Sequence, residues 1–496
     1  MCAAGSTAPT ERVLVKTSCG ALAGRADGDL RVFRGVPFAR PPVGPRRFRA
    51  PEPPEPWRGV RDAGAFAPAS MQPTAGGPVP GMARSPSSED SLYLNVWAPL
   101  DPGPHPVFVW IHGGREVVGG TDDPLYDGAA LATRGIVVVT VAYRLGAFGF
   151  MALDQFLGPD FAGSGNNALR DQVAALRWVQ AEIAAFGGDP RRVTVGGESS
   201  GGLDVAALAA IEGAAGLFGS LILESCFGGR PSHSPAEAEA VTIEVLAHLG
   251  IAPADAAEVL ETSAPQLLAA QAATLAAEPF PFRPVIDDVV LSRSGAEAFR
   301  EGLAAGVPIL IGTNRNEYDL FAGHLPPADP TAALMTNVED EAVAEEIAVA
   351  YRAHYPALAD RERRLRLMSA EEHWIPSIRL AESQVAAGGS AWMYRFDWQP
   401  TDGPMANLRA AHTMELPFVF GTYDALPGGG LTGTSPDRPA LAEKMGDAWA
   451  RFISDADPGW PRFEQAERAT MIFDRRSEVR SDPDGDERRL WDGILK

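Results

Sequence analysis

One serine of the chain stands in a setting that could make it a nucleophile. The segment Gly197-Glu-Ser-Ser-Gly201 has a glycine two residues before Ser199 and another two residues after it. The β-branched run Arg192–Val195 precedes the segment, and the apolar helical run Leu203–Ile211 follows it. A serine in a strained turn between a strand and a helix exposes its Oγ, and the two glycines let the elements pass closely. The pattern predicts a nucleophile, and the alternative is a turn that only begins a helix.

A second segment could stabilise the negative charge that such a nucleophile creates. His112-Gly113-Gly114 follows the apolar run Val107–Ile111. An HGG sequence after a strand places backbone N–H groups over the carbonyl oxygen of a substrate. The alternative is a simple glycine turn. The order of the two motifs along the chain favours the catalytic interpretation.

These motifs need a sheet to hold them. Short strand-like runs occur around Arg12–Lys16 and Arg31–Phe33. Short apolar runs that fit buried strands occur at Tyr93–Trp97, Val107–Ile111, Ile136–Val141, Arg192–Val195, Leu221–Leu223 and Pro308–Ile311. Helical patterns at Leu169–Ala185 and Leu203–Ile211 alternate with them. The alternation predicts an α/β fold with a central, mostly parallel sheet and crossover helices. Ala-rich helical regions are expected at about 235–305 and 335–390, and a late helix at Ala440–Ile453.

Composition excludes several classes of function. The 496 residues carry 43 Lys and Arg against 64 Asp and Glu, a net charge of −21, which disfavours nucleic acid and anionic membranes as partners. Three cysteines, Cys2, Cys19 and Cys226, do not make a disulfide framework. We expect no transmembrane helix and no signal peptide, and hence a cytoplasmic protein. The composition, rich in Ala, Gly and Pro and poor in Lys, suggests a bacterial gene.

With both motifs in view, the chain resembles the type-B carboxylesterases, the α/β-hydrolase family that includes bacterial p-nitrobenzyl esterases and cholinesterases. The segments that carry the resemblance are Phe33–Ala39, Glu89–Trp97, Trp110–Gly114, Tyr143–Phe150, Asn166–Gln172, Phe186–Pro190, Gly197–Gly202, Pro281–Asp287, Ile311–Glu317 and His412–Gly421. Because these motifs extend across one sheet, we expect a single catalytic domain over 12–496, with large helical insertions, behind a flexible tail at 1–11.

The resemblance supplies a catalytic triad. It implies Ser199 as nucleophile, Glu317 as orienting acid and His412 as base, in the chain order of this fold. Without it, His412 could not be chosen from among the eight histidines. It further implies an oxyanion hole made of the backbone N–H groups of Gly114, Arg115 and Ser200. The reaction would be hydrolysis of a small-molecule carboxylic ester through an acyl-enzyme, with no cofactor and no metal, by a protein expected to be a monomer.

The chain departs from the family pattern in several places. Arg115-Glu116 stands where the family has a small residue and an aromatic one, Ser200 stands in place of the common alanine, and Asp204 is polar where an apolar residue was expected. Arg115 either points away from the site or favours substrates with a carboxylate. Met71 and Ser91 occupy the positions at which eukaryotic relatives close a loop with a disulfide.

The substrate pocket and the reaction class leave alternatives. Aromatic residues in the right segments to line an apolar pocket are Phe227, Phe280, Phe282, Phe321, Trp374 and Phe418, although about half of such residues would be ordinary core. Cys226 is expected to be a buried packing residue. The same triad would serve an amidase or a carbamate hydrolase, and the family also contains non-catalytic scaffold and adhesion proteins. Competent residues at all three triad positions argue against that last alternative.

Overall fold

One sheet organises the molecule. The computed structural model describes residues 11–73, 85–226, 232–278, 280–324, 337–338 and 340–494. Within this part of the chain the sheet has thirteen strands: β1 Arg12–Lys16, β2 Ala21–Asp27, β3 Leu30–Pro37, β4 Val60–Asp62, β7 Tyr93–Pro99, β8 His105–Ile111, β9 Val137–Val141, β10 Gly188–Glu198, β11 Ser220–Glu224, β12 Ile309–Asn314, β13 Ala391–Phe396, β14 Ala469–Phe473 and β15 Glu478–Ser481. Two short strands, β5 Ala69–Ser70 and β6 Ser87–Ser88, pair separately.

The strand order is β1-β2-β3-β7-β9-β8-β10-β11-β12-β13-β14-β15, with β4 beside β2. Neighbouring strands from β9 to β14 run parallel, and the pairings at both flanks are antiparallel apart from β2 with β4. The expected α/β fold with a central, mostly parallel sheet is confirmed. Because the carboxyl ends of parallel strands meet at one edge, the loops after β8, β10, β11 and β12 are brought together there.

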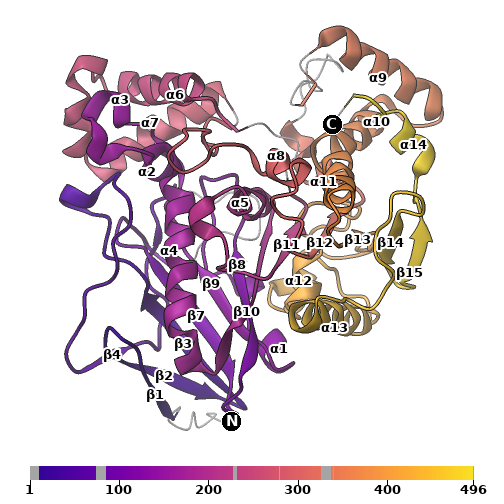
Figure 1. The fold of residues 1–496 in the computed structure, drawn as a ribbon. Coiled ribbons are helices and arrows are strands. Elements are labelled where there is room, and N and C mark those ends of the chain that lie inside the picture. The colour runs from indigo at the N-terminus through magenta and orange to yellow at the C-terminus, as the bar shows by residue number, and fades with distance from the viewer. Residues whose placement is uncertain are drawn as a thin grey trace, which may run out of the picture.

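Helices cover both faces of the sheet (Figure 1). They are α1 Ala129–Ala132, α2 Gly146–Phe150, α3 Asp154–Leu157, α4 Asn167–Glu182, α5 Ser200–Leu208, α6 Pro235–His248, α7 Ala264–Ala277, α8 Gly295–Arg300, α9 Glu341–His354, α10 Asp360–Ser369, α11 Ile375–Ala386, α12 Leu416–Val419, α13 Arg438–Asp455 and α14 Gly485–Arg489. Side chains of β8 alternate between two buried layers. Val107 and Val109 pack in the layer of α4 and α5, and Phe108 and Trp110 pack in the layer of α12 and α13.

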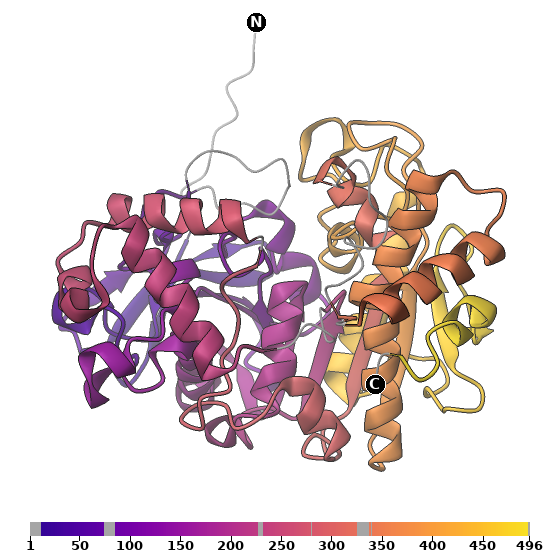
Figure 2. The same ribbon diagram turned by 90° about the horizontal axis from the view of Figure 1, so that it is seen from above.

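Two helical groups stand at the ends of the sheet, as Figure 2 shows from above. One contains α3, α6 and α7, and the other contains α9, α10 and α11. In the described part of the chain, no single helix has the length and apolarity to cross a membrane. The pair formed by α6 and the 3-10 helix Pro253–Leu260, bent by 72°, meets the criterion only when the two are taken together.

Each of the eight strand runs expected from the sequence coincides with a strand. The strands that were not anticipated are β2 and the C-terminal β13, β14 and β15, besides the short β4, β5 and β6. β15 shows why, because all four of its residues are exposed and its sequence, Glu-Val-Arg-Ser, has a single apolar residue.

Candidate active site

Ser199 lies at a sharp turn between β10 and α5. Its backbone has φ 59° and ψ −125°, a conformation that is costly for a residue with a side chain. Its N–H donates to the carbonyl of Glu224 on the neighbouring β11 at 2.9 Å. A Cβ on Gly201 would lie 2.3 Å from the carbonyl oxygen of Ile111, so only glycine fits between the helix and β8. The predicted strand–turn–helix context of the serine is therefore present.

Glu317 and His412 form a buried hydrogen-bonded pair. Glu317 begins the 3-10 helix Glu317–His324 just after β12, and His412 lies in the loop that precedes α12. The imidazole Nδ1 is 2.6 Å from Glu317 Oε2, and the backbone N–H of His412 donates to the Glu317 carbonyl at 3.3 Å. Both side chains are almost completely buried. Residues far apart in the chain thus meet as an acid–imidazole pair.

Further donors hold the Glu317 carboxylate. Its Oε1 accepts hydrogen bonds from Ser225 Oγ at 2.7 Å and from the backbone N–H of Asn314 at 2.6 Å. Burial alone would raise the pKa of Glu317, but the neighbouring His373 and His412, with the hydrogen bonds from His412 and Ser225, lower it overall. The carboxylate therefore stays ionised inside the protein, where it fixes a proton on the Nδ1 atom that faces it.

The other ring nitrogen of His412 faces a second acid. Nε2 lies 3.1 Å from Oε1 of Glu198, the residue immediately before Ser199. Burial and the surrounding carboxyl groups of Glu415, Glu317 and Glu224 raise the pKa of Glu198 well above its usual range. The neutral form of Glu198 is therefore favoured, at the last residue of β10, directly before Ser199.

Several residues of this cluster were not singled out from the sequence. They are Glu198, Glu224, Ser225, Asn314, His373 and Glu415. Glu415 receives a hydrogen bond from the Asn314 side chain and follows His412 by three residues, inside a segment that carries the family resemblance. Glu224 accepts a hydrogen bond from Trp449 Nε1 at 2.8 Å. No spacing along the chain marks these residues, because the packing of β11, β12 and α13 brings them to the site.

A second histidine lies beside the pair. His373, in the π-helical turn Ala370–Trp374, places its Nδ1 3.0 Å from the carbonyl of Ser225, and its ring centre is 4.9 Å from that of His412. Burial lowers the pKa of His373 to about 4. Glu317, His373 and His412 offer donor atoms that lie within 4.8 Å of one another, the distance range of a metal site. Glu317 and His412 already use theirs on each other at 2.6 Å.

The loop after β8 carries two of the three expected oxyanion-hole positions, Gly114 and Arg115, and the third, Ser200, begins α5. Gly114, Arg115 and Glu116 all have positive φ, at 120°, 59° and 63°. The Arg115 guanidinium carbon lies 4.2 Å from the centre of the Phe280 ring, a cation–π contact. Ser200 is the first residue of α5, where a helix leaves its backbone N–H groups without intrahelical partners.

The expected pocket residues occupy different environments. Phe321 is half-buried, and its ring centre is 5.4 Å from that of His412. Trp374 is half-buried directly after His373. Phe418 is fully buried in the core and packs on Phe396 and Trp398, the ordinary packing role that was the alternative for such residues. Phe227 lies outside the described residues.

The remaining positions noted in the sequence are buried or half-buried. Cys226 is fully buried, as expected of a packing residue. Ser91 is also buried, and it accepts a hydrogen bond from Ser70 Oγ at 3.1 Å, while Met71 packs against the core. A hydrogen bond and apolar packing therefore stand where eukaryotic relatives are expected to carry the disulfide.

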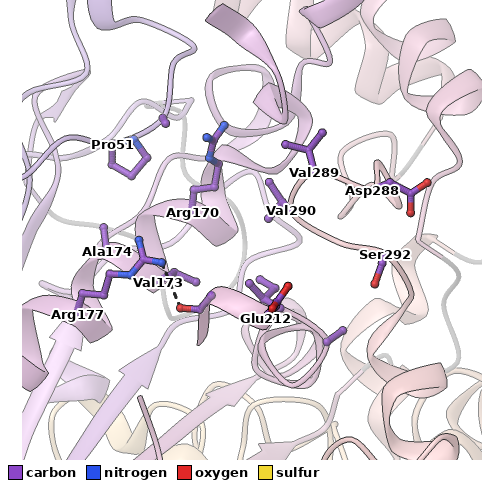
Figure 3. Close-up of a pocket in the computed structure, with 14 residues that line it drawn as sticks. Pro51, Arg170, Val173, Ala174, Arg177, Glu212, Asp288, Val289, Val290 and Ser292 are labelled. Carbon is purple, nitrogen blue, oxygen red and sulfur yellow. Dashed lines mark hydrogen bonds between the residues drawn. The ribbon is translucent and has the colours of Figure 1, made fainter. Parts of the chain in front are cut away.

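A large cavity lies away from this cluster. Its volume is about 640 Å³, and it lies over α4, with Arg170 and Arg177 of that helix, Glu212 and Val289 among its lining residues (Figure 3). None of Ser199, Glu317 and His412 lines it. The candidate chemistry is therefore not at this cavity but at the carboxyl edge of the sheet.

Comparison with known proteins identifies the family. The model of the carboxylesterase family matches residues 11–491. The para-nitrobenzyl esterase of Bacillus subtilis is 36% identical, with 96% of this chain and 98% of that protein covered. The fumonisin B1 esterase of Sphingopyxis macrogoltabida is 35% identical, with 90% of this chain and 84% of that protein covered.

Solved structures agree with this result. A carboxylesterase of Geobacillus stearothermophilus is 38% identical, with a TM-score of 0.85 over 96% of this chain and 99% of that one. A structure of a PNB esterase has a TM-score of 0.87 at 36% identity, with the same coverage. The resemblance inferred from the motifs is confirmed: the chain belongs to the carboxylesterase family and is an enzyme that hydrolyses carboxylic esters.

Proposed function

We propose that Ser199, His412 and Glu317 are the catalytic triad of this esterase. The observation that carries the assignment is the buried 2.6 Å contact between His412 Nδ1 and Glu317 Oε2, while Nε2 of the same ring lies 3.1 Å from the residue preceding Ser199. An imidazole oriented in this way by a charged acid is the base that a serine hydroxyl requires.

The proposed reaction is acyl transfer. His412 Nε2 takes the proton of Ser199 Oγ as the oxygen attacks the ester carbonyl, and Glu317 stabilises the imidazolium that forms. The backbone N–H groups of Gly114, Arg115 and Ser200 receive the negative charge of the carbonyl oxygen. The imidazolium then gives its proton to the leaving alcohol. Water enters and attacks the acyl-enzyme while His412 takes a proton from it. The bond from the acyl carbon to Ser199 Oγ then breaks, the imidazolium returns its proton to Oγ, and the acid leaves.

We propose uncharged carboxylic esters as the main substrates. Phe321 is the sequence-predicted pocket residue that supports this most directly, because its half-buried ring lies 5.4 Å from the ring of the proposed base. An apolar aromatic surface beside the reacting atoms favours an apolar acyl or alcohol group over a charged one.

A covalent probe tests the triad. A serine-directed organophosphate should label the wild-type enzyme at one residue, and Ser199→Ala should remain unlabelled while keeping its fold by circular dichroism. Labelling of Ser199→Ala to the same extent, or no labelling of the wild type, would contradict the assignment. A series of p-nitrophenyl esters compared with the matching anilides then measures ester cleavage against amide cleavage. We expect only the esters to be turned over efficiently.

We further propose that residues 12–496 act as one catalytic domain, and that the protein works as a monomer in the cytoplasm with neither nucleic acid nor membrane as partner. The single sheet spanning the chain supports the first point. The net charge of −21 and the small number of cysteines, three in 496 residues, support the others. Size-exclusion chromatography with light scattering tests the monomer, and a mass of twice 52.5 kDa would contradict it.

A further inference from the structure

Three residues at which the chain departs from the family pattern contact one another behind the proposed oxyanion hole. They are Glu116, on the loop after β8, and Ser200 and Asp204, on α5. Ser200 Oγ accepts the backbone N–H of Glu116 at 3.3 Å. The carboxyl group of Glu116 lies within hydrogen-bonding reach of that of Asp204. In the described part of the chain, Oε1 and Oε2 of Glu116 and Oδ1 of Asp204 receive no donor from any other group. Glu116 and Asp204 are 88 positions apart in the sequence, so their contact exists only because β8 lies beside β10.

The loop needs such contacts because its backbone is strained. Arg115 and Glu116 are consecutive residues in the left-handed region, a conformation that is costly for residues with a side chain unless the surroundings hold it. The Glu116 carbonyl accepts the N–H of Gly146 at 2.6 Å, and the Gly114 carbonyl accepts the N–H of Val118 at 3.1 Å. These backbone bonds fix the far side of the loop, whereas the backbone N–H of Glu116, through Ser200, and the Glu116 side chain, through Asp204, tie the loop to α5.

The two carboxyl groups are in a setting that retains a proton. Glu116 is 2% exposed and Asp204 is not exposed at all. Burial and the neighbouring Asp204 raise the pKa of Glu116 well above its usual range. Burial raises the pKa of Asp204 to about 7, against the opposing effect of hydrogen bonds from Gln172 and Glu116. Glu116 is thus the donor of the pair, and the amide of Gln172 on α4 is the second donor to Asp204.

Two rings beside the loop, those of Tyr143 and His112, carry no charge. Tyr143 interacts electrostatically with both carboxyl groups, and burial together with Glu116 and Asp204 raises its pKa well above its usual value, so the phenol is neutral. Its hydroxyl donates to the carbonyl of His112 at 2.7 Å, and its ring stacks on that of His112 at 4.6 Å. Burial lowers the pKa of His112 to about 4, which leaves this imidazole neutral as well.

We propose that Glu116 and Asp204, sharing one proton, are positioning residues that hold the loop after β8 against the first turn of α5 and so set the oxyanion-hole geometry. The proposal rests on the proposed function, because it assigns the N–H groups of Gly114 and Arg115 on the loop, and that of Ser200 on the helix, to the oxyanion. Loss of the shared proton leaves two adjacent buried carboxylates that repel each other, and the loop and the helix then separate. The contact between Glu116 and Asp204 therefore holds the loop while the proton is bound and is lost as the pH rises.

The experiment compares substitutions that keep or remove the hydrogen bond. Glu116→Gln retains a donor for Asp204, whereas Glu116→Ala leaves Asp204 with the Gln172 amide as its remaining side-chain donor, and Glu116→Ala/Asp204→Ala removes both groups. With a neutral p-nitrophenyl ester as substrate, we expect kcat to fall about 10- to 100-fold in the single and double alanine variants. This decrease is smaller than the ~10²–10³-fold decrease in kcat that follows the removal of one oxyanion-hole donor. KM should change less than about threefold, and Glu116→Gln should retain kcat within about fivefold. The double variant keeps the test available if the single one does not fold.

The pH profile gives a readout that a purely structural role would not move. Because Glu116→Gln has no proton to lose, its kcat should persist at least one pH unit further into the alkaline range than that of the wild type. Glu487→Ala is the matched control, because Glu487 is an equally buried carboxyl that pairs with Tyr355 and Arg366 away from the loop. It should lower Tm and leave kcat per folded molecule unchanged.

The outcomes separate this inference from the proposed function. If the alanine variants keep wild-type kcat, if Glu116→Gln is as impaired as Glu116→Ala, or if the alkaline limbs of Glu116→Gln and the wild type coincide, the pair is not a positioning element. Organophosphate labelling of Ser199 in the wild type would still stand in those cases. If the wild type itself is neither labelled nor active, the proposed triad fails first.

Discussion

Replacing Glu317 by glutamine would test the role of the buried acid with almost no change of shape. In the structure Oε1 accepts two donors, Ser225 Oγ and the Asn314 N–H, and Oε2 accepts the His412 Nδ1 proton. A glutamine has one carbonyl oxygen and one NH₂ group for these places. Its oxygen satisfies the two donors at Oε1, so its NH₂ must face Nδ1. The imidazole then carries its proton on Nε2, and this nitrogen cannot take the proton of Ser199.

The magnitude follows from two losses. The wrong tautomer disables the base, and the negative charge that stabilised the imidazolium is gone. In serine-hydrolase triads, the equivalent acid-to-amide change lowers kcat by about 10⁴. We therefore expect Glu317→Gln to lower kcat by about 10³–10⁴, which corresponds to about 4–5.5 kcal/mol of lost transition-state stabilisation. KM should change less than about threefold, because Glu317 is buried behind the imidazole and does not contact substrate.

The assay is steady-state hydrolysis of a p-nitrophenyl ester at neutral pH, normalised to folded protein by circular dichroism. Glu487→Gln is the control, because it neutralises another buried carboxylate that accepts hydrogen bonds from a tyrosine and an arginine. It should retain kcat within about threefold. Retention of more than a tenth of wild-type kcat by folded Glu317→Gln would refute the assignment of Glu317 as the orienting acid.

Three further predictions concern substrate choice, pH and the turn. Arg115→Gly should lower kcat/KM for esters that carry a carboxylate by about 10-fold or more, because a charge-assisted hydrogen bond contributes ~1.5–3 kcal/mol. For neutral esters, kcat/KM should change less than threefold. Equal effects on the two classes of ester would show that Arg115 does not bind the substrate carboxylate. Burial raises the pKa of Glu224 to about 8. Its contribution to the free energy of unfolding is therefore fully present below the pKa of an unfolded glutamate, near 4.5, and is lost as the pH rises from there toward 8. Urea unfolding of Glu224→Gln should show a weaker decline in that window, and parallel curves would count against it. Gly201→Ala puts a Cβ 2.3 Å from the Ile111 carbonyl, and it should cost ~3 kcal/mol or more of stability together with activity; a thermal melt like that of the wild type would contradict this.

The sequence predicted best where local pattern and fold agree. The strand at Leu221–Leu223 and the turn at Ser199 are marked by apolar runs and by glycines, because the two elements they belong to are buried on both sides. β13 was missed although all of its residues are buried, because Arg395 interrupts its apolar run; Asp397 and Asp484 pair with that guanidinium inside the protein. A buried ion pair cannot be recognised before its partner is placed.

Some residues of the candidate site could be identified from local sequence, and others could not. Ser199 could be found from its own neighbours, whereas nothing near His412 distinguishes it from the other histidines, and its selection depended on the family resemblance. The acids around it are a different case. Asp204 was noted as an unexpected polar residue and Glu116 as an unusual one, but their contact arises from the adjacency of β8 and β10. Local sequence shows each departure, and only the fold shows that they are one structure.

The order of the strands determines when the chain can become active during synthesis. The serine turn is complete once β8, β10 and β11 have paired, at about the middle of the chain. Its proposed base comes later, in a loop anchored where Asn316 donates to the Ala410 carbonyl, and β13, which lies beside β12, must be in place before that loop. On the proposed triad, a nascent chain synthesised only through β11 has its nucleophile without its base, because residue 412 has not yet been made. Hydrolytic activity is one of the last properties that the polypeptide acquires.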